Sequence, residues 1–216
     1  MKVYNLVSSA YGVSNLSLRR LKVSRINKLN DPFELLAADL LDRKHRVALQ
    51  KMKDNLDSTN GLICFSEEWN SPLLWGHYAD SHTGMALGFE VPDDYLLKVN
   101  YTTNRAKIEF DEKSRKVING QHVVNQLIRT KYKDWAYEQE QRMFINLKDT
   151  YEEAGNRFYD FNEHLQLREV ILGIKCSLSV DKVRKLVQSE VPNVKVLKAG
   201  MALRTFRVIE DRNFRP

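Results

Sequence analysis

The sequence predicts an α+β fold in which a mixed, mainly antiparallel central sheet is flanked by helices. Short apolar runs suited to strands recur along the chain, and fewer segments have the spacing of amphipathic helices. Predicted strands and predicted helices do not alternate strictly along the chain, whereas in a doubly wound fold they would. The chain has 216 residues, 43% of them hydrophobic, which is enough for a full core. We therefore expect one globular domain over residues 1–216.

The first sixty residues predict two short strands and one long helix. The strands are expected at Lys2–Val7 and Lys22–Ile26 because apolar and polar side chains alternate there. Pro32 disfavours the helical region for the residue before it and suits the first turn of a helix. Asp31 is therefore placed to cap an amphipathic helix that runs to about Leu56.

Residues 61–90 form the stretch in which a functional site is expected. Leu62–Phe65 and Met85–Phe89 are apolar runs too short for helices, so we predict two buried strands. Plain turns would be enough to connect two such strands. The connection instead holds a dense set of aromatic and polar side chains: Trp69, Trp75, His77, Tyr78, Asp80, Ser81 and His82.

The second half of the chain predicts strands interspersed with two helices. Val117, Val124 and Leu127 lie near helical spacing, which predicts a helix from 116 to 133, and Ser179 is placed to cap a helix from 180 to 190. Residues 151–164 are polar and are expected to form a loop or a short helix. The expected strands are 95–101, 106–110, 169–174, 194–197 and 203–209.

Two carboxylates near position 140 are candidates for chemistry. Glu138, Glu140 and Arg142 alternate, so an extended segment would place all three on one face. Paired carboxylates suit acid–base work and the stabilisation of a developing cation. The alternative is a solvent-facing edge on which Arg142 is a surface ion-pair partner.

The net charge of +6 is unevenly distributed. All charged side chains between positions 14 and 28 are basic, whereas residues 61–101 carry six carboxylates and Lys98 alone. Basic side chains bind phosphates, so Arg19, Arg20 and Lys22 are candidates for nucleic-acid binding. A solvated surface without a partner is the alternative.

Other classes of protein are disfavoured by the sequence. No apolar run is long enough for a membrane span and no signal peptide opens the chain, so we expect a cytoplasmic protein without a membrane partner. His77, Asp80 and His82 match no zinc spacing, so no metal site is expected. The chain also lacks a Gly-x-Ser-x-Gly elbow, a P-loop and a Gly-x-Gly-x-x-Gly motif.

Several short motifs together resemble a bacterial family known as domain of unknown function 2971. The likeness extends from about Tyr4 to the strand at 169–173. The motifs that carry it are Asn30-Asp31-Pro32-Phe33-Glu34, Cys64-Phe65-Ser66, Leu74-Trp75-x-His77-Tyr78-Ala79-Asp80-x-His82-x-Gly84 and Trp135-x-x-Glu138-x-Glu140-x-Arg142. The family name implies no activity.

The order of three elements also resembles that of ADP-ribosyltransferases. The first element is Tyr4 or Arg25. The second is Phe65-Ser66 followed by His77-Tyr78, and the third is Glu138-Gln139-Glu140, similar to a Glu-x-Glu loop. A clear Ser-Thr-Ser triplet is missing, which leaves the first and second elements open.

The second resemblance implies an enzyme that uses NAD as a co-substrate and modifies a nucleic acid or a protein, as a bacterial toxin or phage-defence effector would. In it, Glu140 stabilises the cation and Glu138 serves the acceptor. Arg25 pairs with the pyrophosphate, and Tyr78 or Trp75 lies against nicotinamide. The expected cofactor-binding set is Tyr4, Arg25, Asp31, Ser66, Trp75, His77 and Tyr78. The alternatives are a non-enzymatic nucleic-acid-binding module and an NAD glycohydrolase.

Overall fold

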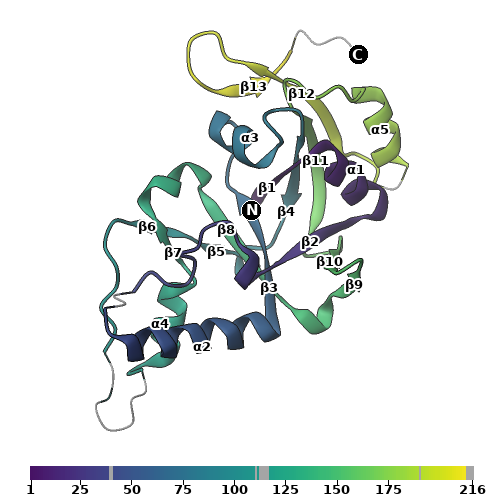
Figure 1. Ribbon diagram of the computed structural model, residues 1–216. Helices are drawn as coiled ribbons and strands as arrows, with labels where there is room; N and C mark the ends of the chain where they lie inside the picture. The colour runs from purple at the N-terminus through teal and green to yellow at the C-terminus, as the bar shows by residue number, and fades with distance from the viewer. Residues whose placement is uncertain (39–40, 110, 112–116, 190, 213–216) are drawn as a thin grey trace.

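A computed structural model describes residues 1–38, 41–109, 111, 117–189 and 191–212 (Figure 1). It has the predicted α+β class, with an 11-stranded sheet in which most neighbouring strands are antiparallel. The main path of the sheet has the order β13-β12-β11-β4-β1-β3-β2-β10-β9, and β8 joins β3 to β5. A separate parallel pair consists of β6 and β7.

The strands of the large sheet are β1 (Lys2–Val7), β2 (Arg20–Arg25), β3 (Asn60–Ser66), β4 (Met85–Glu90), β5 (Leu97–Lys98), β8 (Glu140–Asn146), β9 (Tyr151–Glu153), β10 (Asn156–Asp160), β11 (Gln166–Leu172), β12 (Lys195–Met201) and β13 (Val208–Glu210). The small pair is β6 (Asn100–Thr102) and β7 (Thr130–Tyr132). The helices are α1 (Ser9–Leu18), α2 (Arg43–Thr59), α3 (Pro72–Tyr78), α4 (Gly120–Leu127) and α5 (Val180–Gln188). Short 3₁₀ helices are η1 (Ile26–Lys28), η2 (Asp93–Tyr95), η3 (Lys133–Glu138) and η4 (Leu147–Asp149).

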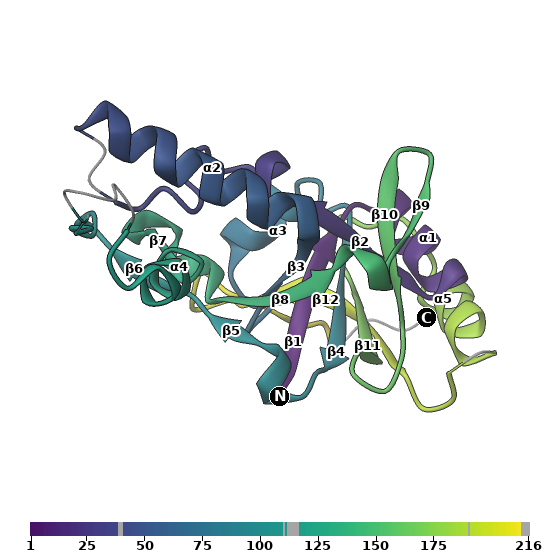
Figure 2. The same cartoon turned by 90° about the horizontal axis from the view of Figure 1, so that it is seen from below.

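The helices cover the sheet in three groups. On one face, Leu16 of α1 and Val183 of α5 pack in one cluster with Leu87 of β4. On the other face, Trp75 of α3 packs in one cluster with Ala86, the residue before Leu87 in the same strand. This alternation is the period of two that a strand buried on both faces requires. At the far end of the molecule from α1 and α5, α2 packs against α4 (Figure 2).

Several sequence predictions of elements are confirmed. β1, β3 and β4 form where apolar runs predicted strands, and α5 begins after Ser179, whose side chain accepts a hydrogen bond from the Lys182 amide. None of the helices in the described part of the chain is both long and apolar enough to cross a bilayer.

The long helix predicted after Asp31 begins later. Residues 32–35 form turns, Leu35 has φ 60°, and α2 starts only at Arg43. A leucine in the left-handed region interrupts a helix, and here its side chain is buried at 1% exposure. Burial of Leu35 and of Glu34 beside it therefore outweighs helix propensity.

Four other predictions of elements in the second half of the chain are wrong. Among the described residues of the strand expected at 106–110, only Ala106 forms a bridge, with Ala38, and the strand expected at 203–209 is limited to its end, where β13 begins at Val208. The helix expected at 116–133 is confined to α4, and β7 follows it within the predicted range; residues 112–116 lie outside the described part. The loop expected at 151–164 contains the β9–β10 hairpin. Ala154 and Gly155, both with positive φ, make its turn, and Phe158 pairs with Tyr151 across it.

Candidate active site

The candidate site lies where two strands that share one edge of β3 separate. β2 pairs with the first part of β3, at Gly61 and Leu62, and β1 pairs with its end, at Ser66. Between these pairs, the described strands leave that edge of β3 without a ladder. The Asn5 side-chain amide instead donates to the Cys64 carbonyl at 3.1 Å. A split in the sheet thus opens a space beside β3.

This split forms a cavity of about 270 Å³. Its size suits part of a small organic ligand, since ligand pockets usually measure about 300–1,000 Å³. Residues of β1, β2 and β3 line it on one side, and the 28–34 segment, α3 and the Glu138–Glu140 region close it. The polar lining residues are Tyr4, Asn5, Lys22, Ser24, Lys28, Asn30, Glu34, Cys64, Ser66, Tyr78, Lys131, Glu138 and Glu140.

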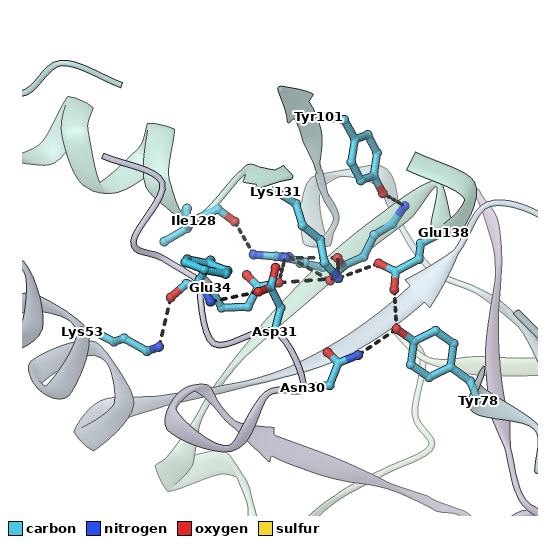
Figure 3. A network of polar contacts seen from close by, with 12 residues as sticks. Asn30, Asp31, Glu34, Lys53, Tyr78, Tyr101, Ile128, Lys131 and Glu138 are labelled. Carbon is cyan, nitrogen blue, oxygen red and sulfur yellow. Dashed lines mark hydrogen bonds and ion pairs between the residues drawn. The ribbon is translucent and has the colours of Figure 1, made fainter. Parts of the chain in front are cut away.

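A buried network of ion pairs forms the floor of this cavity (Figure 3). Arg142 Nε lies 2.8 Å from Glu140 Oε1, and Arg142 Nη2 lies 2.8 Å from Glu34 Oε1. Lys131 Nζ lies 2.6 Å from Glu138 Oε2 and 3.2 Å from Glu140 Oε2. Three carboxylates therefore share two cations away from water. Charges are buried in this way only where partners compensate for lost hydration.

Neutral groups complete the network. The Tyr78 hydroxyl donates to Glu138 Oε1 and accepts from the Asn30 amide at 2.9 Å. The Tyr101 hydroxyl accepts from the Glu140 backbone N–H at 2.8 Å. Glu34 Oε2 is buried and has no hydrogen-bond partner among the described residues. The network thus draws on the 30–34 segment, α3, β6, β7 and β8, which are far apart in sequence.

The backbone brings Glu138 and Glu140 together by a kink. Glu138 ends the 3₁₀ helix η3, Gln139 has φ 44°, and Glu140 begins β8. The predicted extended segment over both carboxylates is therefore wrong, although both do line one cavity. The alternative of a solvent-facing edge is also wrong, because Glu138, Glu140 and Arg142 are 5%, 4% and 1% exposed.

The two carboxyl groups have pKa values displaced in opposite directions. Burial raises the pKa of Glu138, and the opposing effect of Lys131 does not cancel it. Burial acts on Glu140 as well, but the charges of Arg142 and Lys131 outweigh it and lower its pKa. Glu140 thus stays ionised while Glu138 is the more basic group. Such a separation assigns different acid–base roles to neighbouring carboxylates.

Three of the residues predicted for the site form a row across adjacent strands. Tyr4 of β1 is the cross-strand partner of Ser66 of β3, and Ser66 is the partner of Glu140 of β8. All three line the cavity. The Tyr4 hydroxyl donates to Glu169 Oε1 at 2.8 Å, and the Ser66 hydroxyl donates to the Glu68 carbonyl at 2.7 Å. Tyr78, also predicted, is linked to this row through Glu138 and Lys131, because Lys131 pairs with both Glu138 and Glu140.

Arg25 and Trp75 lie outside the residues that line the cavity. Arg25 Nη2 donates to Asp57 Oδ2 at 2.6 Å, so its guanidinium is engaged by α2. Trp75 is fully buried, and its indole N–H donates to the Trp69 carbonyl at 2.6 Å. Its ring packs in the core beneath α3, so of the two aromatic residues expected against nicotinamide only Tyr78 faces the cavity.

His77 and Asp31 also lie outside the cavity lining. His77 Nδ1 is 2.6 Å from the Tyr137 hydroxyl, and its ring packs against Trp135. Asp31 is buried, and its Oδ1 accepts from the Phe33 amide at 2.9 Å. Asp31 caps the turn that presents Glu34 to the network, so it contributes to the site by fixing the backbone of that turn.

The three basic residues expected to bind nucleic acid have different surroundings. Arg20 is 4% exposed and is held by Glu153, with Nη1 2.6 Å from Oε2. Arg19 is exposed at the end of α1, and Lys22 is exposed where it lines the cavity. Arg20 is thus an internal partner of the β9–β10 hairpin, and Lys22 is the one of the three at the candidate site.

Sequence reasoning missed the cations of the network. The helix predicted at 116–133 includes Lys131, and the role predicted for Arg142 is that of a surface partner. Glu34 lies in a motif of the family, but the helix predicted after Asp31 places it in an exposed first turn. A lysine next to an aromatic residue, as Lys131 is next to Tyr132, carries no signal of burial. In contrast, Glu34 and Arg142 each lie in one of the motifs that resemble the family. An ion pair between these two motifs is a signal that the sequence does offer. No group of three His, Cys, Asp or Glu side chains suited to a metal ion occurs in the described part of the chain.

Comparison with known proteins bears on the sequence resemblance. No curated protein and no solved structure matches the chain. The family described as "Protein of unknown function (DUF2971)" matches residues 74–143. The matched segment contains most of α3, β4 and the start of β8, with Tyr78, Lys131, Glu138, Glu140 and Arg142. Over these residues the chain resembles that family, as the motifs from Leu74 to Arg142 predicted, whereas the motifs at 30–34 and 64–66 lie outside the match.

Proposed function

We propose that the cavity beside β3 binds NAD and cleaves the bond between nicotinamide and ribose, with transfer of ADP-ribose to a nucleic acid or a protein. The observation that carries the proposal is the cross-strand row of Tyr4, Ser66 and Glu140. It joins the first, second and third elements of the resemblance to ADP-ribosyltransferases. The row favours Tyr4 over Arg25 as the first element.

The charges of Glu138 and Glu140 suit this chemistry. When the C–N bond breaks, its electron pair leaves with nicotinamide, which becomes neutral, and positive charge develops on the ribose as an oxocarbenium ion. An ionised Glu140 stabilises that charge. The acceptor oxygen or nitrogen then bonds to the ribose C1′ and gives up its proton. Glu138, whose pKa is raised, is the group suited to take that proton.

The rim of the cavity suits the phosphates of a dinucleotide. Lys22 and Lys28 line it and are exposed, in contrast to the buried Lys131 and Arg142. Mobile lysine side chains bind phosphate as point charges. In this arrangement the pyrophosphate lies at the rim and the nicotinamide ribose faces the carboxylates. Lys22 and Lys28 take the role that the sequence suggested for Arg25, because Arg25 is paired with Asp57.

Tyr78 is suited to bind the nicotinamide ring. It is half-buried in the cavity wall, and its hydroxyl is fixed by Asn30 and Glu138, so its ring has a defined orientation. A contact between aromatic rings contributes about 0.5–1.5 kcal/mol beyond the area it buries. The same residue thus links ring binding to the position of Glu138.

The proposal extends to biological role by analogy. An enzyme that attaches ADP-ribose to a macromolecule can inactivate it, so a toxin or phage-defence effector fits this chemistry. The basic charge of the chain suits an acidic acceptor such as RNA or DNA.

Incubation with NAD labelled in the adenylate part tests the proposal. The purified protein is mixed with total RNA, DNA or cell lysate, and label on macromolecules and free ADP-ribose are both measured. Label on one acceptor class is the expected result. Free ADP-ribose without transfer identifies an NAD glycohydrolase, in which water is the acceptor. Binding of nucleic acid without consumption of NAD supports the non-enzymatic module and overturns the proposal.

A further inference from the structure

A second cavity of about 480 Å³ lies beside the first. The Asn30–Glu34 segment separates the two. Asn30 and Glu34 line the first cavity, whereas Asp31, Pro32 and Phe33 line the second. Lys131 lines both. The function proposed above uses the first cavity alone, so the second is without a role.

Aromatic side chains form much of the wall of the second cavity. Phe33 is 57% exposed and Tyr132 is 50% exposed, and Trp135 is half-buried beside them. Large apolar side chains that gather on one exposed surface mark interaction sites more often than single ones do. Flat rings that remain accessible are suited to stack on another planar group.

Cations lie next to these rings. The Arg105 guanidinium carbon is 5.4 Å from the centre of the Phe33 ring, and Lys131 Nζ is 4.8 Å from the centre of the Trp135 ring. The carboxylate among the described lining residues, Asp31, is 4% exposed and its Oδ1 is bound to the Phe33 amide. The accessible charge of the cavity is therefore positive, supplied by the exposed Arg105.

Polar groups line the same cavity near its rim. Thr102 ends β6, Thr103 and Asn104 follow it, and Thr130 begins β7. The Thr102 and Thr130 hydroxyls already donate to the backbone carbonyls of Asn104 and Gln126. The Thr103 hydroxyl and the Asn104 side-chain amide can both donate and accept, so they suit the edge of a heterocycle. This cavity therefore combines rings for stacking, an accessible cation, and polar groups that both donate and accept. These are the features that bind a base together with its phosphate.

We propose that the second cavity binds a nucleobase stacked on the exposed rings of Phe33 and Tyr132, with Arg105 at the adjacent phosphate. Two sources share this chemistry: the adenylate half of NAD and a base of a single-stranded nucleic-acid acceptor. The first cavity is too small for a complete dinucleotide, so either source can extend from one cavity to the other. The proposal concerns binding and does not depend on catalysis in the first cavity.

Titration calorimetry with AMP and with a short single-stranded oligonucleotide tests this site. Phe33→Ala and Tyr132→Ala should each weaken binding of the base by roughly tenfold, because stacking on one aromatic side chain accounts for about that factor. Arg105→Gln should weaken binding most at low salt. Tyr11→Ala is the matched control, since Tyr11 is 65% exposed on α1, outside both cavities.

The two sources give different results. If the cavity holds the adenylate of NAD, AMP and NAD lose affinity by the same factor in both variants. If it holds an acceptor base, the oligonucleotide loses affinity and NAD does not. The proposal is overturned if neither ligand responds more strongly to Phe33→Ala and Tyr132→Ala than to Tyr11→Ala, with all variants folded by circular dichroism. Loss of base binding together with absence of NAD cleavage in the parent protein would retain this site and refute the proposed enzyme.

Discussion

Lys131 Nζ lies 2.6 Å from Glu138 Oε2 and 3.2 Å from Glu140 Oε2, so one ammonium group joins the two candidate catalytic carboxylates. Despite its burial, the pKa of Lys131 is raised because Glu140, Glu138 and Glu34 surround it, and it therefore remains charged. The cation offsets part of the repulsion between the two carboxylates, although burial still keeps the pKa of Glu138 raised.

Glu140→Gln should lower the rate of NAD cleavage by about a hundredfold or more, because it removes the charge that stabilises the developing cation. Binding of NAD should change little. Stability should fall by about 1–3 kcal/mol, since Glu140 is a buried partner of Arg142. Rates are compared below the melting temperature of the variant. Glu67→Gln, which alters an ion pair with Lys98 outside the cavity lining, is the control. Equal rates of NAD cleavage in Glu140→Gln and the parent protein would show that Glu140 has no catalytic role.

Glu138→Gln should suppress transfer to the macromolecule while some hydrolysis of NAD persists, because water needs less orientation than a specific acceptor. In the parent protein, transfer should decrease as the pH falls through the pKa of Glu138, which lies above its ordinary value of 4.5. That decrease should be missing in the variant. Rate profiles for transfer and for hydrolysis, recorded separately, check both statements. A variant that loses transfer and hydrolysis equally would contradict the division of roles.

Lys131→Met should lower the free energy of unfolding by about 3 kcal/mol or more, because Glu138 would lose its ion pair with Lys131 and only Glu34 and Glu140 would keep a cation, Arg142. Adding Glu138→Gln should recover part of the loss, since it removes one uncompensated charge. Urea denaturation measures both. Lys133→Met, at an exposed position two residues away, is the control. If Lys131→Met were as stable as Lys133→Met, Lys131 would not stabilise the network.

Asp57→Asn should destabilise the protein at neutral pH and have little effect in strong acid. Burial alone would raise the pKa of Asp57, but hydrogen bonds from Arg25 and from the Asn27 backbone lower it overall. A lowered folded-state pKa adds stability above the unfolded value of about 3.8, and this stability is lost as the pH falls through the folded value. We expect a difference of about 1–3 kcal/mol at pH 7. Denaturation at pH 7 and near pH 2 measures it, and a difference that does not change with pH would show that the Arg25 pair is not responsible.

Lys22→Gln combined with Lys28→Gln should weaken binding of NAD by about fivefold, at roughly 0.5 kcal/mol for each exposed charge. The loss should shrink as salt is added, because the charges are exposed and screened. Calorimetry at two salt concentrations measures this. Lys51→Gln, an exposed change on α2, should have no effect. Binding that is insensitive to the double variant at low salt would place the phosphates elsewhere.

Strand positions of the fold could be predicted because they depend on local patterns. The apolar runs at 62–65 and 85–89 became β3 and β4, since buried strands need little more than a short stretch of apolar side chains. The pairing of Ser66 with both Tyr4 and Glu140 could not be predicted in this way. It depends on the order of strands in the sheet, to which residues more than a hundred positions apart contribute.

The cations of the buried network were harder to predict than the carboxylates Glu138 and Glu140. Glu138 and Glu140 were identified from their spacing, but Arg142 looked like a surface residue because charged side chains usually are. Its burial is possible only because Glu34 and the Ile128 carbonyl reach it from two other segments. Leu35 shows the same limit for helices: its φ of 60° is fixed by tertiary packing against the core.

The left-handed backbone conformation of Gln139 sets how Glu138 and Glu140 lie relative to each other. A glutamine at φ 44° costs about 1–2 kcal/mol relative to the right-handed region, and glycine at this position would avoid that cost. The cavity therefore depends on how many residues link η3 to β8 more than on which side chain occupies position 139. Gln139→Gly should be tolerated, whereas one residue inserted at this point would turn Glu138 away from Lys131 while β8 kept its register with β3. For anyone redesigning this protein or searching for distant relatives, the length of that link is a more discriminating feature than the identity of its middle residue.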